Sequence, residues 1–228
     1  MFDFKDKVVV VTGGARGIGK CICEGFLASG AKVCVIDLLP NDYFVGDLAD
    51  KDTLEAFAKK VIDDYGHIDY LINNAAPKMC GISNGSYEDF EYALKVGVTA
   101  PFYLSKLFAP YFSSGASIVN ISSIWGVTGG SCECHYSATK AAGIGYTKAM
   151  AKEFGPSGIR VNCVAPGAVD TEMDARFSKE DMEAVAEESA LGYIGKPEEI
   201  AEAVFFAASE KASYMTGAVI NVNGGSVI

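Results

Sequence analysis

The sequence predicts an α/β fold built around one doubly wound parallel β-sheet. Short β-branched or apolar runs alternate with longer amphipathic segments along all 228 residues, the first run leads into a glycine-rich turn, and no linker or repeat divides the chain. This alternation is typical of parallel sheets, because the crossover between two parallel strands usually carries a helix. We therefore expect residues 1–228 to form a single domain.

The first expected strand and the turn after it predict a nucleotide phosphate site. Residues 7–12 read K-V-V-V-V-T, residues 12–19 read T-G-G-A-R-G-I-G, and a helix is expected over residues 20–28. Gly13 allows the tight turn off the strand, Gly17 lets backbone amides approach a phosphate, and Gly19 lets the helix pack close to the sheet. The helix N-terminus then presents its amides and positive dipole end to a pyrophosphate. This order of elements indicates a Rossmann-like fold that binds a dinucleotide.

The second expected strand, residues 32–37, ends in an acidic residue where a ribose-binding carboxylate is found in such folds. Asp37 would accept a hydrogen bond from the adenosine 2′-hydroxyl and repel a 2′-phosphate, which favours NAD. Arg16 argues for NADP, because a guanidinium binds phosphate well. No basic residue directly follows Asp37, so we expect NAD, with NADP as the alternative. Without a cofactor, Asp37 would be a turn or capping residue.

The connection after the second strand is unusually short. Only residues 38–42 separate it from the next strand-like run at 43–45, whereas a parallel crossover usually needs about a dozen residues. This connection contains Pro40 and Asn41 and cannot hold a full helix. We predict that the helix between strands two and three is missing, which would leave one sheet face thinly covered near this edge.

The rest of the chain continues the alternation and brings the expected total to about seven strands. Further strands are expected at residues 68–72, 116–121, 159–164 and 218–222. Further helices are expected at residues 50–65, 87–112 with interruptions at Gly97 and Pro101, 135–154, 179–189 and 197–208.

Charge and cysteine content exclude several classes of protein. The formal net charge of −10 disfavours partners such as nucleic acid or an anionic membrane, and no apolar run approaches the length of a membrane span. The seven cysteines are an odd number and no signal-peptide pattern is present, so we expect reduced thiols in the cytoplasm. Two C-x-C pairs occur, one of them beside His135, but zinc spacing is lacking and no metal is expected.

A tyrosine, a lysine and a serine form the candidate catalytic group. Tyr136 and Lys140 are four residues apart on an expected helix and should share a face, and Ser123 follows the expected strand at 116–121. A free tyrosine titrates near ~10, and a neighbouring ammonium would lower that pKa by stabilising the phenolate. A serine hydroxyl could hold a substrate oxygen against the phenol. Such a group transfers protons to or from an alcohol or ketone. Taken alone, this spacing more often marks a packed tyrosine and a solvated lysine.

Five motifs occur in one order: T-G-G-A-R-G-I-G, N-N-A-A, N-I-S-S, Y-S-A-T-K and P-G-A-V-D-T. With them the chain resembles the short-chain dehydrogenase/reductase family over essentially its whole length. The resemblance implies that Tyr136 is the acid–base, that Lys140 binds the nicotinamide ribose and lowers the tyrosine pKa, and that Ser123 holds the substrate oxygen.

The resemblance also implies a set of cofactor contacts. In the family, the pair matching Asp47 and Leu48 contacts adenine, the N-N-A-A turn lies beside the cofactor with Ala76 replacing a common glycine, and the P-G-A-V-D-T segment surrounds the carboxamide. The implied contacts are Gly13, Arg16, Gly17, Ile18, Gly19, Asp37, Asp47, Leu48, Asn73, Ala75, Tyr136, Lys140, Pro166, Gly167, Val169 and Thr171.

One position departs from the family pattern. The family has an asparagine where this chain has Gly97, in V-G-V-T-A-P-F, and that residue helps to hold a water that links the lysine to solvent. Pro101 has no N–H, so the carbonyl of Gly97 lacks its helical partner and remains available to water. We expect Gly97→Asn to change activity only modestly. The alternative is a kinked helix around a damaged relay.

The substrate pocket is expected to be partly apolar and closed by a mobile lid. The side chains expected beside the substrate are Trp125, Val127, Cys132, Cys134, His135, Met79, Cys80 and the segment 173–193. Trp125 could equally be a packing residue.

The sequence as a whole predicts an NAD(P)-dependent oxidoreductase acting on a secondary alcohol or its ketone. The alternative within the family is an NADPH-dependent 3-oxoacyl reductase, and the alternative of another class is a catalytically poor NAD-binding sensor or scaffold. The resemblance and the small residues of the helix at 135–154 also imply a homodimer or homotetramer.

Overall fold

The computed structural model describes residues 2–77, 79–172 and 178–227 of the chain. Within these residues, seven parallel strands form one sheet in the order β3-β2-β1-β4-β5-β6-β7. The strands are β1 (Val8–Thr12), β2 (Lys32–Asp37), β3 (Phe44–Val45), β4 (Ile68–Asn73), β5 (Phe112–Ile121), β6 (Arg160–Pro166) and β7 (Val219–Val222). The order reverses at β1, which pairs with β2 on one side and β4 on the other, so a crevice for a ligand is expected at their carboxyl ends. The predicted doubly wound sheet is confirmed.

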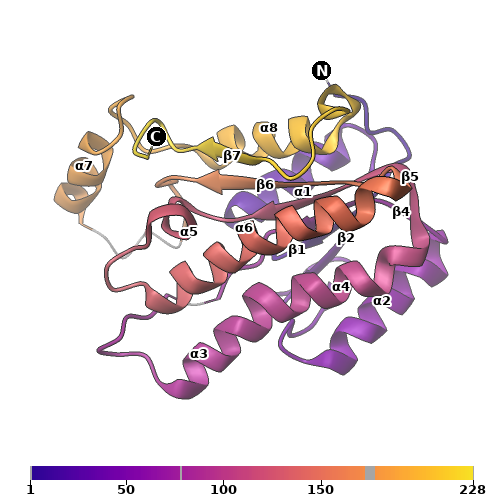
Figure 1. Ribbon diagram of the computed structural model, residues 1–228, viewed down its shortest axis with the longest axis horizontal. Helices are drawn as coiled ribbons and strands as arrows, with labels where there is room; N and C mark the ends of the chain where they lie inside the picture. The colour runs from indigo at the N-terminus through magenta and orange to yellow at the C-terminus, as the bar shows by residue number, and fades with distance from the viewer. Residues whose placement is uncertain (1, 78, 173–177, 228) are drawn as a thin grey trace.

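Helices cover both faces of this sheet and bury two apolar cores (Figure 1). One face carries α1 (Gly17–Ala28) and α8 (Pro197–Ala208), and the other carries α2 (Lys51–Tyr65), α4 (Ala100–Phe108) and α6 (Cys134–Phe154). The shorter helices α3 (Tyr87–Leu94), α5 (Ile124–Thr128) and α7 (Lys179–Glu187) lie toward the carboxyl edge of the sheet. No described helix is both long and apolar enough to cross a lipid bilayer.

The predicted loss of the helix between β2 and β3 is confirmed. Residues 38–43 contain no helix, and the side chain of Asn41 organises them instead. Its oxygen accepts from the amides of Tyr43 and Phe44 at 2.9 Å each, and its nitrogen donates to the carbonyls of Leu39 and Phe44. A compact turn closed by one amide side chain therefore replaces the crossover helix.

The two faces of β2 show the consequence of that loss. Cys34 and Ile36 point toward α2 and are fully buried, because Tyr43 and Phe44 pack with that core. Val33 and Val35 alternate onto the opposite face and are only half-buried. The thinly covered face predicted from the short connection therefore lies on the α1 side of β2.

The long helix predicted over residues 87–112 is interrupted at Gly97 as expected, but it ends at Phe108 rather than at Phe112. A π-helical turn at Lys95–Thr99 separates α3 from α4, with the amide of Ala100 donating to the carbonyl of Lys95. Pro101 cannot donate, so the regular α-helical pattern could not continue through this turn. A 3₁₀ turn follows α4, and β5 begins at Phe112, which pairs with Ile68.

Candidate active site

The glycine-rich turn has the backbone that its sequence predicts. Gly13 and Gly17 adopt φ of +68° and +53°, values that favour glycine. A Cβ on Gly19 would lie 2.0 Å from the carbonyl oxygen of Gly13, so only glycine lets α1 begin this close to the turn. Arg16 is the N-cap of α1 and makes no side-chain cap, and its own side chain is exposed. The first amides of α1 are therefore not satisfied by a capping side chain.

Thr12 and Asn74, which the sequence analysis did not select, hold this turn against β4. The Thr12 hydroxyl accepts from the amides of Asn74 and Ala75 at 3.0 and 3.1 Å. The Asn74 side-chain nitrogen donates to the carbonyls of Thr12 and Gly13 at 3.0 and 2.8 Å. The second asparagine of N-N-A-A was the available signal, because an amide at a strand end can bind two backbone carbonyls. The predicted cofactor residues Gly13 and Ala75 thus share one rigid unit.

Two carboxylates lie at the end of the sheet that would receive an adenosine. Asp37 accepts from the amides of Ala15 at 3.0 Å and Leu39 at 2.9 Å, so backbone donors fix its orientation beside the glycine turn. Asp47 accepts from the amide of Ala49 at 2.8 Å and from the hydroxyl of Tyr92 at 3.1 Å. Leu48, the other predicted adenine contact, is buried in the core and its side chain is a packing group.

The candidate catalytic residues gather where β5 ends. Ser123 is the N-cap of α5, is only 6% exposed, and its hydroxyl accepts from the amide of Trp125 at 3.1 Å. The ammonium of Lys140 donates to the carbonyl of Ile121 at 2.7 Å and lies 5.3 Å from the centre of the Tyr136 ring. Ser122 donates to the Lys140 carbonyl at 2.8 Å, which ties α6 to the same strand end. The structure thus places Lys140 between the Tyr136 ring and the end of β5.

Lys140 is an unusual lysine because its ammonium is buried and, within the described part of the chain, is hydrogen-bonded to a backbone carbonyl rather than to a carboxylate. Only 6% of the residue is exposed, and desolvation lowers the pKa of Lys140 to about 8. A buried ammonium costs free energy unless hydrogen-bond or charged partners offset the loss of water. At neutral pH the group still carries its proton, so it supplies a positive charge beside the phenol of Tyr136.

A chain of buried side-chain hydrogen bonds runs beneath these residues. Asn73 donates to the Asn120 oxygen and Asn120 donates to the Thr147 hydroxyl, both at 2.8 Å, and Thr147 donates to the Gly143 carbonyl at 2.7 Å. These bonds connect β4, β5 and α6. The Asn73 side-chain oxygen is buried and has no hydrogen-bond partner within the part of the chain that the structure describes. Such an atom is an acceptor available to water or to a bound group.

The segment after β6 closes the site from the opposite side. Pro166 ends β6, the amide of Gly167 donates to the Val222 carbonyl at 3.0 Å, and Val169 is buried beside α8. A Cβ added to Gly17 would lie 3.7 Å from the Thr171 side chain, so the glycine turn faces this segment. The predicted cofactor residues of β1, β2, β4 and β6 therefore lie along one edge of the sheet.

Gly97 lies in the π-helical turn and packs directly against α6. A Cβ at this position would lie 2.8 Å from the Cβ and 3.1 Å from the Cγ2 of Thr139, the residue before Lys140. An asparagine could enter only if α6 moved. The expectation of a mild effect for Gly97→Asn therefore does not agree with the structure, although Pro101 still leaves the Gly97 carbonyl without its helical donor.

We now expect Gly97→Asn to lower the free energy of unfolding by about 1–3 kcal/mol, the usual cost of overpacking, and to reduce turnover by displacing Lys140. Gly145→Ala is the matched control, because a Cβ there meets no atom within 4 Å. Chemical denaturation and steady-state kinetics of both variants measure the effect. Wild-type stability in Gly97→Asn would show that the turn tolerates a side chain.

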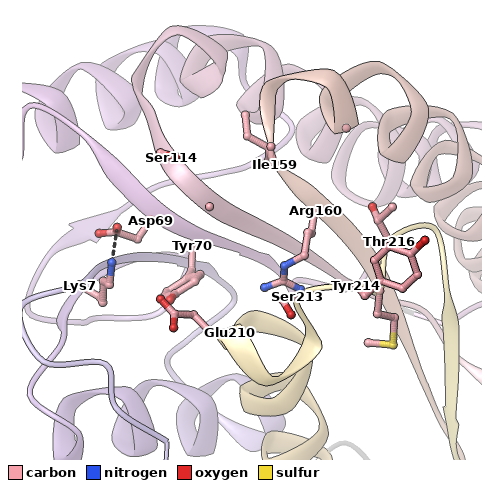
Figure 2. A pocket seen from close by; sticks show the side chains of 14 residues that line it. Lys7, Asp69, Tyr70, Ser114, Ile159, Arg160, Glu210, Ser213, Tyr214 and Thr216 are labelled. Atoms are coloured by element: carbon pink, nitrogen blue, oxygen red, sulfur yellow. Dashed lines mark hydrogen bonds and ion pairs between the residues drawn. The ribbon is translucent and has the colours of Figure 1, made fainter.

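A cavity of about 530 Å³ lies at the other end of the sheet and does not belong to this site (Figure 2). Its polar groups already serve the fold. Lys7 and Asp69 form an ion pair at 3.1 Å, and Arg160 donates to the carbonyls of Ala207, Ala208 and Ser209 at the end of α8. The cavity opens at the amino ends of the strands, whereas ligands of open parallel sheets bind at the carboxyl ends.

Comparison with known proteins agrees with this geometry. A family model described as enoyl-(acyl carrier protein) reductase matches residues 13–226. The chain is 36% identical to the 3-oxoacyl-[acyl-carrier-protein] reductase FabG of Thermotoga maritima, over 97% of this chain and 98% of that protein. This chain belongs to the short-chain dehydrogenase/reductase family. It is an oxidoreductase, and members of the family use NAD or NADP.

Two further members of the family resemble the chain almost end to end. A 3alpha-hydroxysteroid dehydrogenase of Mediterraneibacter gnavus is 34% identical over 96% of both chains. The crystal structure of a Brucella melitensis short-chain dehydrogenase/reductase titled glucose/ribitol dehydrogenase superposes with a TM-score of 0.94, at 31% identity, over 100% of this chain and 99% of that one. The alignment with the Thermotoga protein spans 246 positions, more than this chain has residues, so the relative contains residues that this short-chain dehydrogenase/reductase lacks.

The residues present fit the nicotinamide cofactor of the family. The first turn of α1 begins without a side-chain cap, and Gly17 presents no side chain toward Thr171. A pyrophosphate needs such free amides at a helix N-terminus. Asp37 lies at the end of β2, where a ribose would reach its carboxylate.

The predicted substrate-side residues fall into two groups in this short-chain dehydrogenase/reductase. Val127, Cys132 and Cys134 are exposed. His135 is buried instead, and its Nδ1 donates to the carbonyl of Cys80 at 2.8 Å. Of the expected lid, Met173 and the rest of 173–177 lie outside the described residues, and α7 occupies Lys179–Glu187.

Proposed function

We propose that this protein is an NAD-dependent oxidoreductase that interconverts a secondary alcohol and its ketone at Ser123, Tyr136 and Lys140. One observation carries the proposal. A charged lysine is buried beside a tyrosine ring at the carboxyl edge of the sheet, and the carbonyl of Ile121 holds it there. A merely structural lysine would gain more from solvent than from this position.

Tyr136 acts as the acid–base in this proposal. In ketone reduction its hydroxyl gives a proton to the carbonyl oxygen, and in alcohol oxidation its phenolate accepts one. The charge of Lys140 stabilises that phenolate. An ammonium has three N–H donors, and its bond to Ile121 uses one among the residues that the structure describes, so two can serve the ribose hydroxyls. The Ser123 hydroxyl holds the substrate oxygen. When bound, the nicotinamide ring supplies the hydride-transfer chemistry.

The preference for NAD follows from the charge at the end of β2. Asp37 is held by the amides of Ala15 and Leu39, so its carboxylate cannot turn away from a ribose without losing both bonds. Residues 38–42 contain no basic side chain, and the side chain of Arg16 is exposed and does not cap α1. A 2′-phosphate would therefore meet a fixed negative charge, whereas a 2′-hydroxyl would meet an acceptor.

We expect NAD(H) to stabilise the protein more than NADP(H). A ligand at about 100 times its Kd raises Tm by about 5 °C or more for a chain of this size. Asp37→Asn should weaken NADH binding about tenfold or more, because a charge-assisted hydrogen bond is lost. Asp42→Asn is the control, since it removes a charge from an exposed position of the same loop. Stronger stabilisation by NADP(H) would reverse the cofactor preference and indicate that Arg16 binds the 2′-phosphate of the ribose.

The second candidate is an NADPH-dependent 3-oxoacyl reductase. The name of the Thermotoga relative favours it, whereas the hydroxysteroid and glucose/ribitol dehydrogenases among the similar proteins share only the interconversion of hydroxyl and carbonyl groups. The net charge of −10 opposes an acidic carrier protein as partner unless basic side chains gather locally. Turnover of a 3-oxoacyl thioester with NADPH but not NADH would select this candidate.

A sensor or scaffold that binds NAD without turnover is the remaining class. The Ser123, Tyr136 and Lys140 arrangement opposes it, since a protein that only binds does not need all three.

We also propose that residues 1–228 act as one unit in a homodimer or homotetramer, supported by the exposed Phe102 on α4. The cytoplasmic location stays a prediction.

A further inference from the structure

The structure assigns His135 the role of a positioning residue that fastens the loop at residues 80–85 to the helix that carries Tyr136. This inference rests on the function proposed above, because the loop matters only if Tyr136 faces a substrate. The loop follows the N-N-A-A turn at the end of β4 and leads to α3.

The imidazole is held from three sides. Its Nδ1 donates to the Cys80 carbonyl at 2.8 Å, and because a carbonyl only accepts, this nitrogen carries the proton. The Phe90 ring of α3 meets the imidazole edge to face, with centroids 5.2 Å apart. A Cβ on Gly85 would lie 2.2 Å from the imidazole Cε1 and 2.7 Å from its Nε2. The ring therefore lies directly against the loop backbone.

The loop itself is folded to receive this ring. The Gly85 amide donates to the Gly81 carbonyl at 2.9 Å, and the Gly81 amide donates to the Asn84 side chain at 2.8 Å. A Cβ added to Gly81 would lie 3.0 Å from the backbone of Cys132, so the loop also touches the residues before α6. Two adjacent contacts thus join the loop to the start of α6.

The position of His135 in the helix makes this contact relevant to catalysis. Tyr136 lies between His135, which binds the loop at 80–85, and Ser137, whose hydroxyl accepts from the amide of Gly130 at 3.0 Å. Successive helical residues point in different directions, so the two neighbours of Tyr136 fix one loop on each side of it. The role assigned to His135 is therefore to set where the loop at 80–85 lies relative to Tyr136.

Two substitutions separate the hydrogen bond from the bulk of the ring. His135→Asn keeps a donor in place of Nδ1, since the asparagine nitrogen is also two bonds from Cβ, whereas His135→Leu keeps apolar volume without a donor. Gly85→Ala displaces the ring from the loop side without changing α6, and Gly155→Ala is its control, because a Cβ there meets no atom within 4 Å.

The experiment measures amide exchange of residues 80–86 by mass spectrometry, NADH affinity by fluorescence, and kcat and KM with a small 3-oxo ester and NADH. We expect His135→Leu and Gly85→Ala to speed exchange of the loop and raise KM about tenfold, with kcat and NADH affinity changed much less, and His135→Asn to restore most of the loss. Wild-type exchange and KM in His135→Leu, or no rescue by His135→Asn, would overturn the inference.

The failure of the proposed function has a different signature. If the wild-type protein binds NADH but does not reduce the 3-oxo ester, that substrate class fails, and the exchange measurement alone decides the contact. Faster exchange in His135→Leu but not in His135→Asn then supports the fastening role, and equal exchange in all three proteins overturns it.

Discussion

Tyr136→Phe is expected to lower turnover by about 10²–10⁴-fold while NADH still binds, because the contribution of a positioned acid–base is lost without removal of the ring. The ring lies 5.3 Å from the Lys140 ammonium, so phenylalanine preserves the packing of that pair and deletes only the hydroxyl. Single-turnover kinetics with saturating NADH measure the chemical step, and NADH fluorescence measures binding. The expected result is a fall in kcat with little change in cofactor affinity.

Tyr146→Phe is the matched control for this prediction. Tyr146 lies on the same helix, ten residues further along, and burial raises the pKa of its hydroxyl above the usual range. Its loss should leave turnover within a few-fold of wild type. Comparable activity in Tyr136→Phe and Tyr146→Phe would move the acid–base to another group. Loss of NADH binding in Tyr136→Phe would mean that the hydroxyl serves the cofactor.

The fold was predictable because its signals are local and agree with one another. The β-branched run before Gly13, the glycines of the turn and the acid at Asp37 each determine a short stretch of backbone. Even the missing helix could be predicted, since five residues cannot form a crossover helix whatever the rest of the chain does. Each of these inferences depends on residue types or on chain length within one short stretch, so distant contacts have little influence on it.

The details of the site depend on contacts between distant residues, and the sequence does not show them. Asn74 supports the glycine turn from 61 residues away, and His135 binds the carbonyl of Cys80 from 55 residues away. The sequence placed His135 beside the substrate because its neighbour is Tyr136, but the helix turns the imidazole toward the loop. The π-helical turn was missed for a similar reason, because Pro101 predicts a disruption but not the form it takes.

Gly97 shows how a departure from a family pattern can be compensated by packing. Read from the sequence, the glycine is a deletion of an asparagine side chain. In the structure the space is filled by Thr139, whose Cβ would lie only 2.8 Å from a Cβ added to Gly97. The helix that carries Lys140 thus lies closer to the π-helical turn than a side chain at residue 97 would permit, and the two positions have to be changed together.

The burial of Lys140 is expected to make stability rise with pH. The pKa falls from its usual 10.5 in the unfolded chain to about 8 in the folded protein, which corresponds to about 3 kcal/mol. Below pH 8 both states hold the proton, and the folded state bears the full cost of a buried charge. Between pH 8 and 10.5 the folded protein has released a proton that the unfolded chain still binds, so the free energy of unfolding increases.

The test compares urea denaturation of wild type and Lys140→Met from pH 7 to pH 10.5. The difference in free energy of unfolding, wild type minus variant, should be constant up to about pH 8 and then increase by up to about 3 kcal/mol. Lys148→Met removes a lysine from an exposed position of α6 and corrects for the loss of one positive charge. A difference that stays constant across this range would mean that the ammonium is solvated in solution. The lowered pKa and the buried charge on which the proposed role of Lys140 rests would then be absent, and that role would have to be abandoned.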